Sequence, residues 1–569
     1  MKSLSLDEGM VDSWVTGRVL SGPAARTILA PMRAHKPVRL ILMAALWPAV
    51  PLPADEADPP VPAIATLDQR FLTRVVRRTL EQQLRDESIY EVNYTPPGLR
   101  PVDGQVVVTL RQRGIARGVG TGRRGPVVTA CRDAAIAALV DAARRGPVTL
   151  AWLSRIRVDV EVAGSEVPIA FDGRWSDPTA LNRHIEPGVH GLVLQFGQAR
   201  RQFCPSEIVT KNVTVHDAVR RIAQQLVHSP EELAGATILR FRTRHWHETS
   251  DGGADGQIIE LPRGLVPIEP ADVTRAALTE AIDRLVAYMI YRQLPSGLFS
   301  YQYEPSVDAY SDDDNLVRQA GVVWSLARYA QVSGRSAPAA AADLGLKRLL
   351  GRVVDVPDEP GAAYVAGLDG RHKLGITALT GLALYEQPLG EHHHPVRDRL
   401  LAGVYDRQTD SGLFLTAFPP VRRMSSQYYF PGEALLLIAR AYEDQPSRQA
   451  LEAFNKGFAY YRELWRTDPT PPFAAWHMQA FARMALVTKR RDFADFAFEM
   501  ADWLADKQYD ESNCPWPELH GGIEAYVDAR VGVATASYLE GLTEALSLAR
   551  RLEDDLRRAR YERTVRLAA

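Results

Sequence analysis

The sequence predicts a chain of more than one domain, with an α+β domain in its first half and an all-α domain in its second half. Its 569 residues exceed the usual length of a single domain. Short β-branched runs alternate with helical patterns up to residue 248. Beyond residue 262 the strand patterns nearly vanish, and long and short connections alternate between helices. This alternation favours helical hairpins that close into a ring.

Composition excludes several functional classes. Hydrophobic residues make up 46% of the chain and charged residues 24%, as in an ordinary soluble globular protein. The net charge of −2 provides no overall field toward nucleic acid or an anionic membrane. Cys131, Cys204 and Cys514 form no CxxC pair, so neither a zinc site nor a thioredoxin-type site is expected. A disulfide between Cys131 and Cys204 remains open.

The N-terminal region predicts a secretory signal peptide over residues 32–54. Basic residues open this segment, and the apolar run 40–50 is too short to span a bilayer. Ala54 then offers the small residue that a signal peptidase needs. Residues 1–31 would be an upstream extension from a wrongly chosen start codon, or a disordered tail. No other segment approaches the ~20 apolar residues of a membrane helix, so a periplasmic or secreted protein is expected.

The first domain is expected to cover residues 66–248. Apolar residues at helical spacing predict helices, and β-branched or alternating runs predict strands. The expected helices are 67–85, 132–144 and 215–226, and the expected strands are 105–111, 155–162, 191–196 and 238–244. His245 and His247 alternate along the chain and should share one face of a strand; a metal there is not expected. The Gly/Asp-rich residues 249–262 predict a linker.

Three stretches carry a family resemblance: GQVVVTLRQRGIARGVGTG, PVTLAWLSRIRVDVEV and EPGVHGLVLQFGQARRQFCPSEI. In order and spacing, residues 66–248 resemble an AMMECR-type domain. The first segment of that family usually reads Arg-Gly-Cys-Ile-Gly-Thr, whereas residues 117–121 read RGVGT and lack the cysteine. The resemblance therefore implies a fold more than an activity. Gly118, Gly120 and Gly122 are expected to serve a tight turn, or else to let backbone amides approach an anion.

The second half, residues 263–569, predicts an (α/α)6-type toroid. Expected helices cover 272–292, 316–331, 340–352, 376–385, 395–405, 431–442, 448–465, 476–487, 492–508, 531–548 and 552–565. The helices that follow the long, aromatic connections start about fifty residues apart, which is typical of a repeat. The tripeptide GLF even recurs at 297–299 and 412–414. One hairpin cannot bury its apolar face alone, so neighbours must close around a shared core with the long loops on one rim.

This layout resembles the six-hairpin superfamily of glycosidases, polysaccharide lyases and sugar epimerases. The resemblance is architectural, covers residues 270–566, and includes no family-defining catalytic motif. It implies a carbohydrate substrate held in the cleft of the ring, with no cofactor.

Polar and aromatic side chains at the loop-to-helix junctions are the candidate site. Inverting glycoside hydrolysis needs an acid and a base, for which Glu433 and either Asp313 or Asp314 are proposed. Uronate epimerase or lyase chemistry is the alternative, with Arg318, Tyr428 and His477 as the acting residues. A non-catalytic glycan-binding or envelope scaffold protein is the third hypothesis. The expected substrate-binding residues are Arg318, Tyr301, Tyr310, Lys373, Tyr428, Tyr429, Trp476, Trp516, Glu518, His520 and Glu540.

Overall fold

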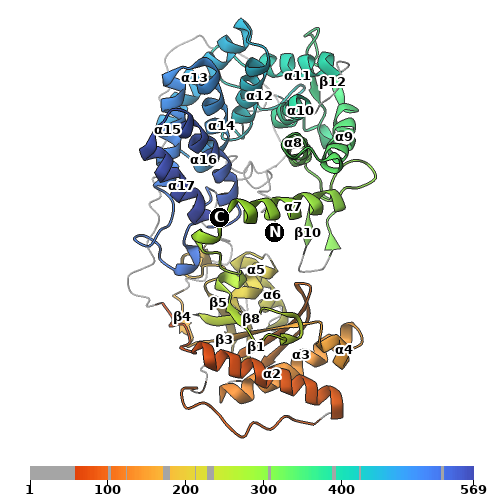
Figure 1. Ribbon diagram of the computed structural model, residues 1–569, viewed down its shortest axis with the longest axis vertical. Coiled ribbons are helices and arrows are strands. Elements are labelled where there is room, and N and C mark those ends of the chain that lie inside the picture. Colours follow the sequence, from red (N-terminus) through yellow and green to blue (C-terminus); the bar gives the residue numbers. More distant parts are fainter. Residues whose placement is uncertain are drawn as a thin grey trace, which may run out of the picture.

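The computed structural model describes residues 58–569 apart from short gaps at 87, 100, 102–103, 124, 171–179, 212, 227–235, 305–308, 387–392, 422–424 and 527–530. The predicted signal peptide and the stretch before it lie outside the described residues. The described chain forms a mixed domain of sheets and helices followed by a ring of helices (Figure 1). The predicted fold class is therefore confirmed.

The first sheet of the mixed domain has five antiparallel strands in the order β2-β1-β3-β8-β9. The strands are β1 (Val106–Gln112), β2 (Ile115–Gly122), β3 (Arg157–Ala163), β8 (Thr243–Glu248) and β9 (Ile258–Glu260). Helices α2 (Thr66–Asp86) and α3 (Val127–Arg145) pack on it, and Val158, Val160 and Val162 of the central strand belong to that core. Because strand residues alternate, the polar residues of β3 lie on the opposite face. β9 falls within the predicted linker, so part of that segment is sheet.

A second sheet has the strand order β4-β7-β5-β6. Its strands are β4 (Val167–Pro168), β5 (Gly191–Phe196), β6 (Ala199–Phe203) and β7 (Thr237–Phe241), with α5 (Pro205–Thr210) and α6 (Val215–Leu226) beside them. The single strand expected over 238–244 is two strands, because the chain passes from one sheet to the other at Arg242. Cys131 and Cys204 are both free and buried, in different hydrophobic clusters.

The glycines of β2 explain a close contact between strand and helix. A Cβ atom on Gly118, Gly120 or Gly122 would stand 2.2, 2.1 or 1.9 Å from a backbone carbonyl oxygen of α3. Real Cβ atoms do not approach oxygen so closely, so only glycine lets α3 lie directly on this strand. The glycines therefore serve helix packing, and the expected tight turn or anion site is wrong.

The second half is a ring in which alternate helices line the inside. The inner helices are α8 (Leu316–Ser333), α10 (Leu374–Glu386), α12 (Phe430–Asp444), α14 (Pro471–Thr488) and α16 (Ala534–Arg551). The outer helices are α9 (Ser336–Leu350), α11 (His394–Asp406), α13 (Arg448–Thr467), α15 (Arg491–Ala505) and α17 (Asp555–Ala568), while α7 (Arg275–Tyr291) packs against α9. Each inner helix contacts the next, as Figure 1 shows. The first and last inner helices are joined by an ion pair between Arg328 and Glu544 at 3.1 Å.

A repeated glutamine contact explains why a glycine recurs in the long connections, including the glycine of both GLF stretches. Gln293, Gln408 and Gln508 each follow an outer helix, and each side-chain amide donates to two backbone carbonyls at 2.8 to 3.4 Å. One carbonyl belongs to a glycine with a positive φ, and the other belongs to the second helix further along the chain, which is α9, α13 or α17. The glycines are Gly297, Gly412 and Gly521, and the helical carbonyls are those of Ala341, Ala453 and Thr564. The repeat is thus a device that ties neighbouring hairpins together.

The long connections meet one another, as a common rim requires. The backbone N–H of Phe418 donates to the carbonyl of His372 at 2.8 Å, which joins the second and third long connections. The Tyr428 hydroxyl donates to Asp468 at 2.6 Å, and the Tyr428 ring lies 5.4 Å from that of Tyr526, which adds the fourth and fifth. These contacts place four of the long connections together beside the starts of the inner helices.

Candidate functional site

Glu433 is the most unusual ionisable group of the ring. It lies in the first turn of α12, where Pro431 occupies an early helical position that needs no backbone N–H. The side chain is 3% exposed, and its Oε2 has no hydrogen-bond partner among the described residues. Burial raises the pKa of the Glu433 carboxyl from 4.5 to about 8, so the group is protonated at neutral pH. Gly375 provides the room, because a Cβ there would stand 2.2 Å from Oε2.

Two charged side chains from neighbouring helices act on Glu433. Lys373, just before α10, lowers the pKa of Glu433, and Glu540 of α16 raises it. Burial lowers the pKa of Lys373 to about 8, against the opposing charge of Glu433. Glu540 is exposed as a residue, but the protein around its carboxyl group displaces water and so raises its pKa. The charge of Arg328 and a hydrogen bond with Gln479 act in the opposite direction and lower the pKa. The buried acid therefore faces one cation and a second carboxylate.

Aromatic side chains surround these charges. Trp324 of α8 and Trp476 of α14 have ring centroids 6.2 Å apart. Burial raises the pKa of Tyr429 to about 12, an effect that the charge of Arg318 opposes, so Arg318 and Tyr429 lie near each other. Flat apolar faces beside donors and acceptors suit sugar rings. We call the side chains that the five inner helices and their first turns contribute here the bowl: Arg318, Trp324, Lys373, Tyr429, Glu433, Trp476 and Glu540.

Asp313 and Asp314 do not take part in this arrangement. Both are exposed and precede Asn315, the residue that caps α8. Asp313 accepts a hydrogen bond from the Ser311 hydroxyl at 2.9 Å, and Asp314 accepts one from Gln319 at 2.8 Å. The charges that act on Glu433 are those of Lys373 and Glu540, and neither aspartate is among them.

His477 is a packing residue. Helix α14 begins at Pro471, not at 476, so His477 lies in its second turn and is fully buried. Its Nδ1 donates to the carbonyl of Phe473 at 2.9 Å, and the two rings stack with centroids 3.6 Å apart. Burial lowers the pKa of His477 to about 3 and keeps the ring neutral. This position does not fit a base that touches substrate.

The tyrosines of the first long connection contact one another and the end of α7. The ring of Tyr310 is 5.0 Å from that of Tyr303 in the small hairpin of β10 (Tyr303–Glu304) and β11 (Ala309–Tyr310). The guanidinium of Arg292, which ends α7, stacks on Tyr310 at 3.7 Å. Tyr301 precedes this hairpin and is half-buried. The hairpin therefore packs with α7.

Trp516 and Glu518 bind the first domain. The Trp516 indole donates to Asp58 at 3.1 Å, and its ring meets that of His190 edge-on at 5.1 Å. Glu518 accepts a hydrogen bond from Arg242. The last long connection is thus held on the mixed domain, and its aromatic and acidic residues serve that contact. His520, two residues beyond Glu518, is exposed.

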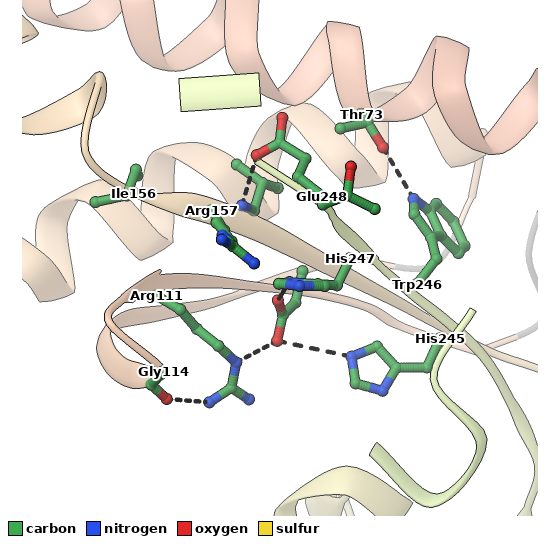
Figure 2. A network of polar contacts seen from close by, with 12 residues as sticks. Thr73, Arg111, Gly114, Ile156, Arg157, His245, Trp246, His247 and Glu248 are labelled. Atoms are coloured by element: carbon green, nitrogen blue, oxygen red, sulfur yellow. Dashed lines mark hydrogen bonds and ion pairs between the residues drawn. The ribbon is translucent and has the colours of Figure 1, made fainter. Parts of the chain in front are cut away.

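The mixed domain holds a polar network of its own (Figure 2). Asp159 of β3, 2% exposed, accepts a hydrogen bond from Arg111, lies 3.0 Å from Nδ1 of His247 and is ion-paired with His245 at 3.8 Å. Burial opposes ionisation, but the two histidines and Arg111 hold the pKa of Asp159 below its usual range. The prediction that His245 and His247 share one face is confirmed. Within the described residues, no group of three His, Cys, Asp or Glu side chains could hold a metal ion.

The two sheets, their order and the close packing of β2 on α3 define the first domain. Residues 73–246 match the model of the AMMECR1 family. The AMMECR1-like domain is also similar to the uncharacterized protein PH0010 from Pyrococcus horikoshii, with 24% identity over 35% of this chain and 98% of that one, at a TM-score of 0.30. No curated protein matches the chain.

The ring is similar in fold to solved carbohydrate-active proteins. The GH76 α-mannanase BT2949 from Bacteroides thetaiotaomicron is 13% identical over 53% of this chain and 85% of that one, with a TM-score of 0.40. A cellobiose 2-epimerase from Spirochaeta thermophila is 14% identical over 50% of this chain and 83% of that one, also at 0.40. These likenesses concern the fold. Among the described residues, no helix is both long and apolar enough to cross a bilayer.

Proposed function

We propose that the ring is a glycoside hydrolase that acts on a polysaccharide in the bowl. The observation that supports this most strongly is that Glu540 lies close enough to the buried acid Glu433 for its charge to raise the pKa of that carboxyl group. Glycoside hydrolysis uses two carboxyl groups in different protonation states. Burial keeps Glu433 protonated at neutral pH, and Glu540 has the exposure that a water-activating base needs.

In this mechanism the Glu433 carboxyl donates its proton to the glycosidic oxygen as the bond to the anomeric carbon breaks. The Glu540 carboxylate takes a proton from a water molecule, whose oxygen forms the new bond to that carbon. Lys373 stabilises the carboxylate that Glu433 becomes after proton transfer. The tryptophans hold the sugar rings by their C–H faces.

A screen of polysaccharides with product analysis tests the proposal. Glu433→Gln and Glu540→Gln should each lower kcat by at least roughly a hundredfold, the usual size of an acid–base contribution. Glu511→Gln, a change at an exposed carboxylate of the last long connection, should leave kcat unchanged. Because the acid must carry its proton, kcat should fall as the pH rises through about 8. Full turnover by the Glu433→Gln protein would remove the assignment.

Uronate epimerase or lyase action and non-catalytic glycan binding are the alternatives. Product analysis in the same screen separates them: a lyase leaves an unsaturated sugar at the cleaved end, an epimerase leaves the chain length unchanged, and binding alone leaves the polysaccharide unaltered. We further propose that the protein is exported after removal of residues up to 54. N-terminal sequencing of the mature protein tests this, since an intact N-terminus would contradict export.

A further inference from the structure

A pocket opens between the second and third long connections, next to Glu433. Its lining includes Arg371, His372 and Lys373 from one connection and the hydroxyl residues Thr416, Ser425 and Ser426 from the other. Among the described residues that line it there is no carboxylate. Arg371 and Lys373 give this surface positive charge, and His372 and the facing hydroxyl groups give it hydrogen-bonding groups.

Two helices begin at this pocket. Lys373 immediately precedes α10, and Phe430, which also lines the pocket, is the first residue of α12. Helix N-termini carry partial positive charge, so both ends favour an anion through their dipoles. The first N–H group of each is already used: Leu374 donates to the Thr416 carbonyl at 3.0 Å and Phe430 to the Ser426 carbonyl at 3.3 Å. Since His372 Nδ1 accepts a hydrogen bond from the backbone N–H of Gly367 at 3.1 Å, the ring proton is on Nε2, which makes that atom a donor.

The pocket adjoins the buried acid. A Cβ atom on Gly375 would stand 2.2 Å from Oε2 of Glu433 and 2.7 Å from the ring of Phe430, so both side chains lie against the same point. A ligand group in the pocket would thus sit one residue layer from the proton donor.

We propose that this pocket is a subsite for the anionic group of an acidic saccharide, either a carboxylate, a sulfate ester or a phosphate ester. The inference rests on the proposed carbohydrate site and names the class of its substrate. An anion here would be held by Lys373 and Arg371, by Nε2 of His372 and by hydroxyl donors. A neutral sugar would gain no charge-assisted hydrogen bond from Arg371 or Lys373, so we expect the pocket to favour acidic over neutral polymers.

Calorimetric titration of the full-length protein tests the subsite without relying on turnover. The probes are four short oligosaccharides of equal length: a galacturonide, a sulfated one, a phosphorylated one and a neutral one. At least one acidic probe should bind roughly tenfold or more tightly than the neutral probe, as expected for one charge-assisted contact. The acidic probe that binds best identifies the anion, and raising the salt concentration should weaken it selectively.

Variants locate the binding. Arg371→Gln should weaken the acidic probe by roughly tenfold and leave the neutral probe unchanged, and Lys373→Met should weaken the acidic probe more than the neutral one. Arg348→Gln, which removes a charge from the exposed side of α9, is the matched control and should change neither. If Lys373→Met fails to fold, Arg371→Gln, a change at an exposed side chain, carries the test.

Equal binding of acidic and neutral probes, or acidic binding that neither variant weakens, would overturn the subsite. The outcome for catalysis is separate. Tight acidic binding without turnover supports the subsite while refuting hydrolysis. Turnover of neutral polymers that is indifferent to Arg371→Gln refutes the subsite while supporting hydrolysis.

Discussion

Replacing Glu433 by glutamine should change how the stability of the protein depends on pH. In the unfolded chain this carboxyl ionises near its usual pKa of 4.5, whereas in the folded protein it keeps its proton up to about 8. The unfolded state therefore releases a proton that the folded state retains, and Glu433 lowers the free energy of unfolding as the pH rises from 4.5 to 8. Glutamine has no such proton.

The size of the effect follows from the pKa. Each pH unit in this window removes about 1.4 kcal/mol from the wild type relative to the variant. The difference in the free energy of unfolding, Glu433→Gln minus wild type, should thus be about 3 kcal/mol larger at pH 7 than at pH 4. Above pH 9 it should be about 5 kcal/mol larger than at pH 4. Below pH 4.5 the free energies of unfolding of the wild type and the variant should differ by an amount that does not depend on pH, because both side chains are then neutral.

Urea unfolding of both proteins at pH 4, 5.5, 7 and 8.5 measures this difference. The other titratable groups are common to both proteins and cancel in the subtraction. Glu511→Gln should give a difference close to zero at every pH. A Glu433→Gln difference that does not change with pH would show that Glu433 is ionised in the folded protein, and the reasoning about its burial would fail.

Three further changes test the packing described above. Gly375→Ala should push the Glu433 carboxyl aside and lower the free energy of unfolding by about 1–3 kcal/mol; thermal unfolding measures this, and an unchanged Tm would contradict the contact. Arg77→Met leaves its buried acidic partner unpaired and should cost about 3–5 kcal/mol, whereas the exposed Arg78→Met should cost under about 1 kcal/mol in the same urea unfolding. Trp516→Ala should loosen the contact between the two domains, so limited proteolysis should cut the last long connection faster, and an unchanged cleavage rate would argue against docking.

Much of the fold follows from the periodicity of the sequence. The alternation of RIRVDVEV predicts β3, and the regular long connections predict a ring with one rim. Local chemistry also placed Glu433 correctly in the first turn of a helix, because Pro431 marks helix starts. The same kind of reasoning placed the start of α14 too late, at residue 476. The helix begins at the tandem prolines 471–472, and Trp476 lies a turn further on.

Only the tertiary structure decided which of these side chains meet. Glu433 interacts with Glu540, more than a hundred residues away, in place of Asp313 or Asp314, and nothing in local sequence encodes that choice. The sequence predicted Trp516 as a sugar-binding residue, but in the structure its indole contacts the first domain. Short-range patterns determine helices, strands and their caps, because these depend on neighbours along the chain. Burial, pKa and partnership depend on the packing of distant segments, and so they emerge only when the ring closes.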